Sequence, residues 1–115
     1  MLGFRVLAVA MLAALVGFTA NVIANHGLNL LPVFFGDMAA GGWPGQFNAD
    51  FLTFLVLSGL WTAWRNSFSG AGLLLGILAF NLGGVFLLSY LIYLSWKCQG
   101  DWAKVLLGDH YKGGI

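Results

Sequence analysis

Three polar side chains interrupt apolar stretches of this sequence, namely Asp50, Asn81 and Asn21. A carboxylate inside a membrane segment is a candidate proton or cation site, because hydrocarbon solvates charge poorly. Asp50, however, follows Asn48 at the start of an apolar run. An Asn cap and the helix dipole would stabilise a carboxylate there without any function, and we favour that interpretation. For the two amides we favour interhelical hydrogen bonds over a polar lining for an ion or ligand path.

A second pattern is a stripe of small residues at spacings of four, three and four: Gly72, Gly76, Ala79 and Gly83. Residues at these spacings share one face of a helix, and a smooth face lets another backbone or a flat cofactor ring approach closely. The stripe, bordered by Asn81, therefore predicts a packing surface. Its partner is either another helix of this chain or a separate subunit.

Cofactor and catalytic motifs are weak or missing in the sequence. His26 is a candidate pigment or haem ligand, although an ordinary hydrogen bond at the membrane surface explains it better. No CxxC or HExxH spacing points to a metal, and the serines lack a nearby base, so we expect no enzyme. Cys98 is the single cysteine and cannot form an intramolecular disulfide. Contact with a pigment, a haem or lipid stays open.

The composition predicts that these residues are positioned by membrane-spanning helices. Of the 115 residues, 60% are hydrophobic and 8% are charged, whereas a soluble domain carries about 25% charged residues. A span needs about 20 apolar residues. Residues 6–24, 47–64 and 70–96 meet or approach that length, the first exceeding a typical signal-peptide core. We expect one all-α membrane domain with three transmembrane helices.

Shorter segments complete the expected architecture. Residues 31–40 predict a short interfacial helix, with Pro32 at a first helical position. Residues 101–107 predict an amphipathic tail with Trp102, Val105 and Leu106 on one side. A tight turn over 65–69 would join the second and third spans as a hairpin. Aromatic belts are expected near the ends of these two spans, at Trp61, Trp64, Tyr90, Tyr93 and Trp96.

The charges give a weak indication of orientation. The net charge is +1, which does not favour nucleic-acid binding. Three crossings would place Arg5 and Arg65 on one side and Lys97, Lys104 and Lys112 on the other. We favour a cytoplasmic N-terminus in a bacterial inner membrane, since the long first loop has no Lys or Arg. No cluster of four Lys or Arg indicates a polybasic lipid-binding patch.

The order of motifs resembles families of short bacterial three-span membrane proteins known as domains of unknown function. The resemblance is carried by residues 26–30 with 34–35, by 49–52, by Trp61-Thr62-Ala63-Trp64-Arg65, and by Asn81-Leu82-Gly83. It covers roughly residues 6–93 and leaves out the tail from Trp96 onward. It implies a three-span fold and no known activity.

Two functions follow from these features. The first is a non-catalytic subunit or an accessory or assembly protein of a larger membrane complex of the respiratory or photosynthetic type, since three helices bury little surface and partners are expected. The partners would be the lipid bilayer, other membrane subunits or further copies of the chain. The alternative is a small oligomeric transporter or channel that uses Asp50 and Asn81. A membrane enzyme ranks last.

Overall fold

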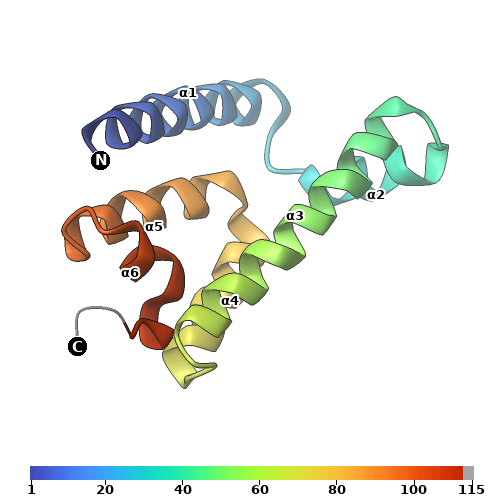
Figure 1. The fold of residues 1–115 in the computed structure, drawn as a ribbon. Helices are drawn as coiled ribbons and strands as arrows, with labels where there is room; N and C mark the ends of the chain where they lie inside the picture. The colour runs from blue at the N-terminus through green and yellow to red at the C-terminus, as the bar shows by residue number, and fades with distance from the viewer. Residues whose placement is uncertain (113–115) are drawn as a thin grey trace.

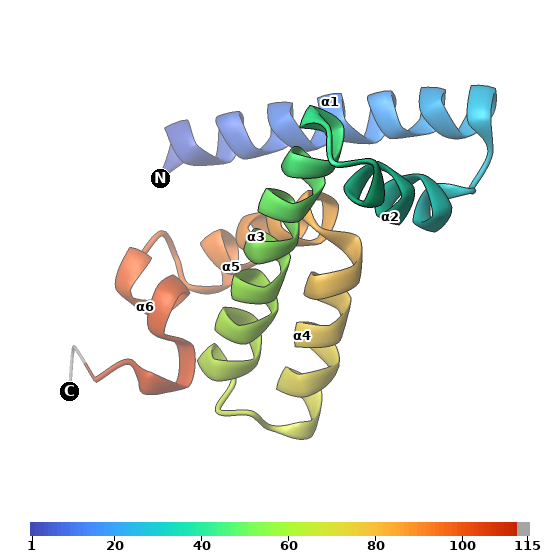
Figure 2. The same cartoon turned by 90° about the vertical axis from the view of Figure 1, so that its right-hand side faces the viewer.

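The computed structural model describes residues 1–112 and places most of them in helices (Figure 1), in agreement with the expected all-α class. The order is α1 (Leu2–His26), α2 (Leu30–Ala40), α3 (Trp43–Arg65), α4 (Gly70–Leu82), α5 (Gly84–Lys97), α6 (Trp102–Leu107) and a 3₁₀ turn, η1 (Gly108–His110). In Figure 2, α3 and α4 run side by side in opposite directions, and α1 is oriented across them.

Helix α1 contains the whole first predicted span and ends at Gly27, whose φ of 75° lies in the left-handed region that glycine tolerates. Its first half packs on α5. Ala8 is buried, and Leu15 approaches Gly84 so closely that a Cβ on that glycine would lie 3.1 Å from Leu15 Cδ2. Residues 16–26 are exposed.

Helices α2 and α3 form a tight corner. Helix α2 has the bounds expected for the interfacial helix within one residue. Helix α3 begins at Trp43, with Gly42 as its N-cap and a proline in its first turn, four residues before the predicted start of the second span. Gly45 lies against α2, where a Cβ would be 2.7 Å from the Cα of Met38. Only a residue without a side chain permits this approach.

A four-residue turn joins α3 to α4, as the sequence predicts. The hydroxyl of Ser69 caps α4 by accepting the N–H of Gly72 at 3.0 Å. Ser67 and Phe68 have φ values of 56° and 53°, so the turn uses the left-handed region at two non-glycine positions. The two helices are therefore antiparallel neighbours.

The expectation of one continuous helix over residues 70–96 is wrong. The chain breaks at Gly83, which has φ 59° and ψ −132°, and α5 starts a new direction at Gly84. Two adjacent glycines are weak helix formers, and the first also supplies the left-handed φ that the break requires. Helices α4 and α5 have 13 and 14 residues, so each is about 20 Å long at 1.5 Å per residue.

The core lies where α5, α6 and the N-terminus meet. Tyr90, Leu94 and Val105 are buried together, and Met1 and Trp61 pack against them. Helix α6 matches the predicted tail, with Asp101 as its N-cap. Of the three residues expected on its inner side, Val105 is buried, whereas Trp102 and Leu106 are 42% and 49% exposed.

Large hydrophobic side chains are exposed on every helix from α1 to α6. Among residues 1–112, α1 is the one helix long and apolar enough to cross a membrane by length and composition. The three-span prediction is thus not confirmed, and it depends on how the remaining helices meet a bilayer.

Candidate functional site

The candidate ion-site residues Asp50, Asn21 and Asn81 are exposed, and the side chains of the two asparagines bond within their own helices. The amide of Asn81 donates to the carbonyl of Ile77, and the amide of Asn25 donates to both oxygens of Asn21. The expected interhelical hydrogen bonds of the two asparagines are therefore wrong. Asp50 makes no contact with either amide. Its sequence neighbour Phe51 lies against Gly83 at the α4–α5 break. Asp50 itself is nine residues, two and a half turns, from Gly59, which faces α4, so its side chain lies on the side of α3 away from α4.

The capping interpretation of Asp50 is wrong as well. Because α3 begins at Trp43, Asp50 is the eighth residue of the helix and lies beyond its first turn. Asn48 does not cap the helix. Its amide donates to the carbonyl of Phe34 at 3.0 Å and ties α2 to α3. Asp50 is thus an exposed carboxylate on an apolar helix, without the dipole contact that the sequence suggested.

The small-residue stripe packs within the chain. Gly72, Gly76 and Ala79 are buried. A Cβ on Gly76 would lie 2.9 Å from the carbonyl oxygen of Gly59 on α3, and the reciprocal Cβ on Gly59 would lie 3.0 Å from the carbonyl oxygen of Gly76. Of the two partners that the stripe left open, this is a helix of the same chain. Gly83 is not part of the helical stripe, because it forms the break.

His26 is the exposed last residue of α1. The residues described, 1–112, contain no group of three His, Cys, Asp or Glu side chains that could hold a metal ion. Haem or pigment ligation by His26 stays a prediction.

The cluster that the sequence did not indicate surrounds Arg65, which is 6% exposed. Its Nε donates to the carbonyl of Val105 at 2.6 Å, and its Nη2 donates to the carbonyl of Lys104 at 3.2 Å. Its Nη1 donates to the hydroxyl of Tyr90 at 3.2 Å, and that hydroxyl also accepts from Asn66. Arg65 therefore binds the C-terminal carbonyls of α6, where cations are favoured.

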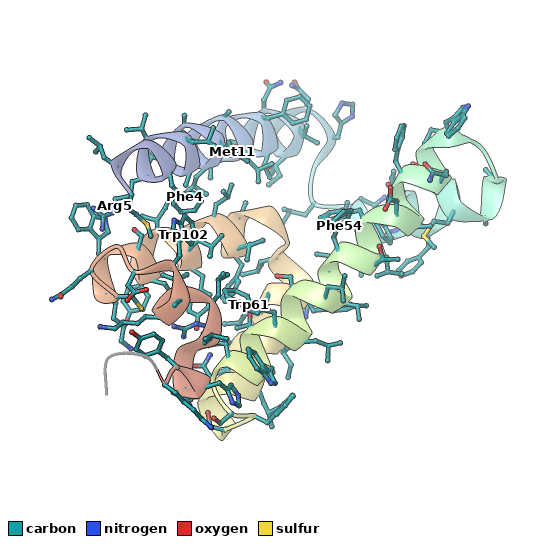
Figure 3. The ribbon with its side chains drawn as sticks, in the orientation of Figure 1. Phe4, Arg5, Met11, Phe54, Trp61 and Trp102 are labelled. Atoms are coloured by element: carbon teal, nitrogen blue, oxygen red, sulfur yellow. The ribbon has the colours of Figure 1, made fainter. Side chains whose placement is uncertain are left out.

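Two aromatic residues of α3 complete this attachment of the tail. Trp61 points from α3 toward α6 (Figure 3), and its indole N–H donates to the carbonyl of Leu106 at 3.0 Å. The ring of His110 stacks on Trp64 with centroids 4.1 Å apart. Tyr90 lies in the core. The structure thus uses Trp61, Trp64 and Tyr90 to hold α6 and η1, whereas the sequence predicted aromatic belts facing lipid headgroups.

Arg5 plays a similar part at the end of α5. Its Nε donates to the hydroxyl of Ser95 at 3.0 Å, and its Nη2 donates to the carbonyl of the same residue at 2.7 Å. The guanidinium lies 3.6 Å from the centroid of the Trp96 ring. The edge of Phe4 meets Trp102 nearby, with centroids 4.6 Å apart, which joins α1 to α6 (Figure 3).

These contacts gather the cations at one end of the molecule. Arg65 bonds the carbonyl of Lys104. Lys104 in turn lies 5.6 Å from the ring of Tyr111, the residue before Lys112. Arg5 bonds Ser95, which lies two residues before Lys97. We call this region the basic end, defined by the five cationic side chains Arg5, Arg65, Lys97, Lys104 and Lys112. The five cations share one end of the molecule because α5 returns toward the N-terminus after the break, whereas the sequence predicted that three crossings would divide them between two sides of a membrane.

The acids are divided differently. Asp101 and Asp109 lie at the basic end, which leaves five cations minus two acids, a side-chain charge of +3. Asp37 and Asp50 lie on α2 and the N-terminal third of α3, in the opposite part of the molecule (Figure 1). The fold therefore turns a nearly neutral sequence into a molecule with a positive end and a negative end.

No protein-family model, curated protein or solved structure matches this chain. The resemblance to short bacterial membrane proteins stays a prediction from the sequence. The structure contains packing surfaces and a cluster of cations. Arg5 and Arg65 bond carbonyls near helix ends, and the three lysines of the basic end are exposed.

Proposed function

We propose that this chain is a non-catalytic integral membrane protein that acts as a small subunit, or as an assembly factor, of a larger membrane complex. The observation that carries the proposal is the second half of α1, where an apolar helix of span length extends beyond its contacts with α5. In the 18-residue window that fits a span, 6% of the residues are buried. A surface of this kind needs lipid or another protein to cover it.

The helix lengths favour a particular arrangement in the bilayer. Helices α1 and α3 have 25 and 23 residues, so they are about 37 and 35 Å long, which is enough by length for a hydrocarbon core of about 30 Å with some tilt. Helix α1 is also apolar enough for a span, whereas α3 is less apolar and would cross beside other helices. Helices α4 and α5 are each too short. We infer that they form a re-entrant pair, which enters after Arg65, turns at Gly83 and returns to the basic end.

This arrangement replaces the three crossings expected from the sequence and changes the topology. Met1 lies beside Gly100, so the N-terminus and the start of the tail share one side. The positive-inside rule then places the basic end in the cytoplasm, with α2 and the α3 start on the other side of a bacterial inner membrane. Reporter fusions test this. Two crossings put an N-terminal and a C-terminal reporter on the same side, whereas three crossings put them on opposite sides.

Partner binding is tested on the outer face of α1. Gly17 follows the buried Ala8 by nine residues, two and a half turns, so it lies on the opposite side of the helix. A Cβ there would meet nothing within 4 Å. We expect Gly17→Leu to abolish co-purification of partners from native membranes extracted with gentle detergent, while thermal stability stays the same or rises. Gly36→Leu is the control, since Gly36 on α2 is equally open. Retention of every partner by Gly17→Leu would refute the role of this face.

An oligomeric transporter or channel is the second candidate, because one observation favours it. Discontinuous helices within membranes mark substrate and ion sites in transporters. Here Asn81 lies two residues before the break at Gly83, and Asp50 precedes Phe51, which contacts Gly83. Proton or cation flux in liposomes tests it. Flux that is present in the wild type and lost in Asp50→Asn would favour this function over the first.

A further inference from the structure

The groove between α1 and α5 has a polar end and apolar walls. It has a volume of about 450 Å³ and is lined by Val6, Val9, Ala10 and Ile92, with Arg5 and Trp96 at the basic end. Val9 is 52% exposed and Trp96 is 65% exposed. Within residues 1–112, no acidic side chain lines it. The cation at one end and the aliphatic side chains beyond it have the same order as the polar headgroup and the acyl chains of a lipid.

Arg5 is held in place with donors to spare. A guanidinium has five N–H donors, and two of them go to Ser95, which leaves three for a ligand. The Trp96 ring, whose centroid lies 3.6 Å from Arg5 Cζ, and the two bonds to Ser95 together hold the guanidinium in place. An anchored guanidinium with free N–H groups suits bidentate binding of a phosphate.

The surrounding charges favour an anion at this position. Lys97 is the next residue after Trp96 and is exposed. The nearest acid in the sequence, Asp101, is occupied with α6, since its Oδ1 accepts the N–H groups of Ala103 and Lys104. Tryptophan is also one of the two residues enriched at the headgroup level of membranes.

We propose that this groove binds an acidic phospholipid, with the phosphate on Arg5 and Trp96 and one acyl chain along Val6, Val9 and Ile92. The inference rests on the proposed membrane location of the chain. A free phosphate would leave the apolar walls in contact with water, and a neutral lipid would not use the local positive charge. A lipid with a net negative headgroup satisfies both halves of the groove.

Native mass spectrometry of the full chain in mixed micelles tests the proposal. The micelles contain phosphatidylglycerol or phosphatidylcholine at equal mole fraction. We expect the wild type to retain phosphatidylglycerol preferentially by about fivefold, the factor that one arginine near an anionic surface supplies. Equal retention of the two lipids by the wild type would overturn the proposal.

Three variants separate the groove from general surface charge. Arg5→Gln should remove the preference, and Val9→Trp should lower retention of both lipids by filling the groove while Arg5 stays in place. Lys97→Gln is the comparison, because Lys97 lies beside the groove without lining it, and it should lose less of the preference than Arg5→Gln. If Lys97→Gln loses as much as Arg5→Gln, or if Val9→Trp binds lipid normally, the groove is not the site. Val9→Trp also decides the case if Arg5→Gln fails to fold, since it leaves the Ser95 bonds intact.

Two further measurements distinguish the lipid site from a soluble-phosphate site and from a chain that lies outside the membrane. Glycerol phosphate, which has no acyl chain, should not displace the bound phospholipid at millimolar concentration, and displacement would show a site for soluble phosphates. Failure of the proposed membrane location is recognised independently, because the chain would then be released from vesicles of either lipid by alkaline carbonate. A chain that stays in the vesicles but binds both lipids equally contradicts the lipid site alone.

Discussion

The close approach of α3 and α4 gives the sharpest quantitative test of the fold. At the crossing, Gly59 and Gly76 face each other, and a Cβ on Gly76 would lie 2.9 Å from the Gly59 carbonyl oxygen and 3.3 Å from the Cβ of Ala63. The first neighbour is backbone and cannot rotate away. Replacing Gly76 by alanine must therefore push the two helices apart or strain them.

The size of the effect follows from two opposing contributions. Alanine is a better helix former than glycine by roughly 0.8–1 kcal/mol, whereas an extra methyl group in a packed interface typically costs about 1–3 kcal/mol. Gly17→Ala is the matched control, because Gly17 is also inside a helix but has nothing within 4 Å of its Cβ position. The control gains the first contribution without the second, so the difference between the two variants measures the overpacking cost.

The assay is reversible unfolding of each variant by SDS in mixed micelles, followed by circular dichroism. We expect Gly17→Ala to be as stable as the wild type or more so, and Gly76→Ala to be less stable than Gly17→Ala by about 1–3 kcal/mol. Gly59→Ala should behave like Gly76→Ala, and the double variant should lose less than the sum, because one separation of the helices relieves both contacts. Equal stability of Gly76→Ala and Gly17→Ala would show that the helices do not meet at these glycines.

Three other substitutions test the tail and the carboxylate. Arg65→Met should destabilise the chain by about 1–3 kcal/mol, because it leaves the Val105 carbonyl unpaired, and should accelerate hydrogen exchange in α6; unchanged exchange would contradict the attachment. Gly108→Ala should cost more than Gly41→Ala. Both glycines have positive φ, but a Cβ on Gly108 would lie 2.7 Å from Arg65 Cγ, whereas nothing lies within 4 Å at Gly41; equal melting temperatures would contradict the contact. Asp50→Asn should change stability by less than about 0.5 kcal/mol, because the residue is exposed and beyond the first turn, and a larger shift in melting temperature would point to a partner for the carboxylate.

Local patterns predicted the helices well and the bends poorly. Run length and turn chemistry placed α1, α2, the turn after Arg65 and the end of α6 at Gly108 within a few residues. The adjacent glycines at 83 and 84 were also visible, but the first fitted a packing stripe equally well. A glycine on a helix face and a glycine that ends a helix have the same signature in sequence. Whether such a glycine ends the helix depends on whether another helix packs into the bend, as α3 does here through Phe51.

The cluster at Arg65 could not be found from the sequence for a different reason. An arginine after Trp64 at the end of an apolar run is typical of a membrane surface, and its true partners, the carbonyls of Lys104 and Val105, are backbone atoms about 40 positions away. Backbone carbonyls carry no residue signature. The gathering of cations at the basic end was hidden likewise, since it follows from the direction of α5 after the break.

The break at Gly83 connects the two candidate functions. Helix geometry leaves the last carbonyls of α4 and the first N–H groups of α5 without intrahelical partners, and the Gly83 N–H closes back on the Ala79 carbonyl. In hydrocarbon each unpaired group costs several kcal/mol, so irregular backbone is tolerated where it is buried in protein or meets water. A partner subunit over the break would supply the first condition, and a water-filled path beside Asp50 and Asn81 would supply the second. Gly83 itself is buried against Phe51 and Leu55 of α3, so this chain already supplies part of the first condition. A partner subunit or a water-filled path would have to cover only the exposed residues before the break, Asn81 and Leu82.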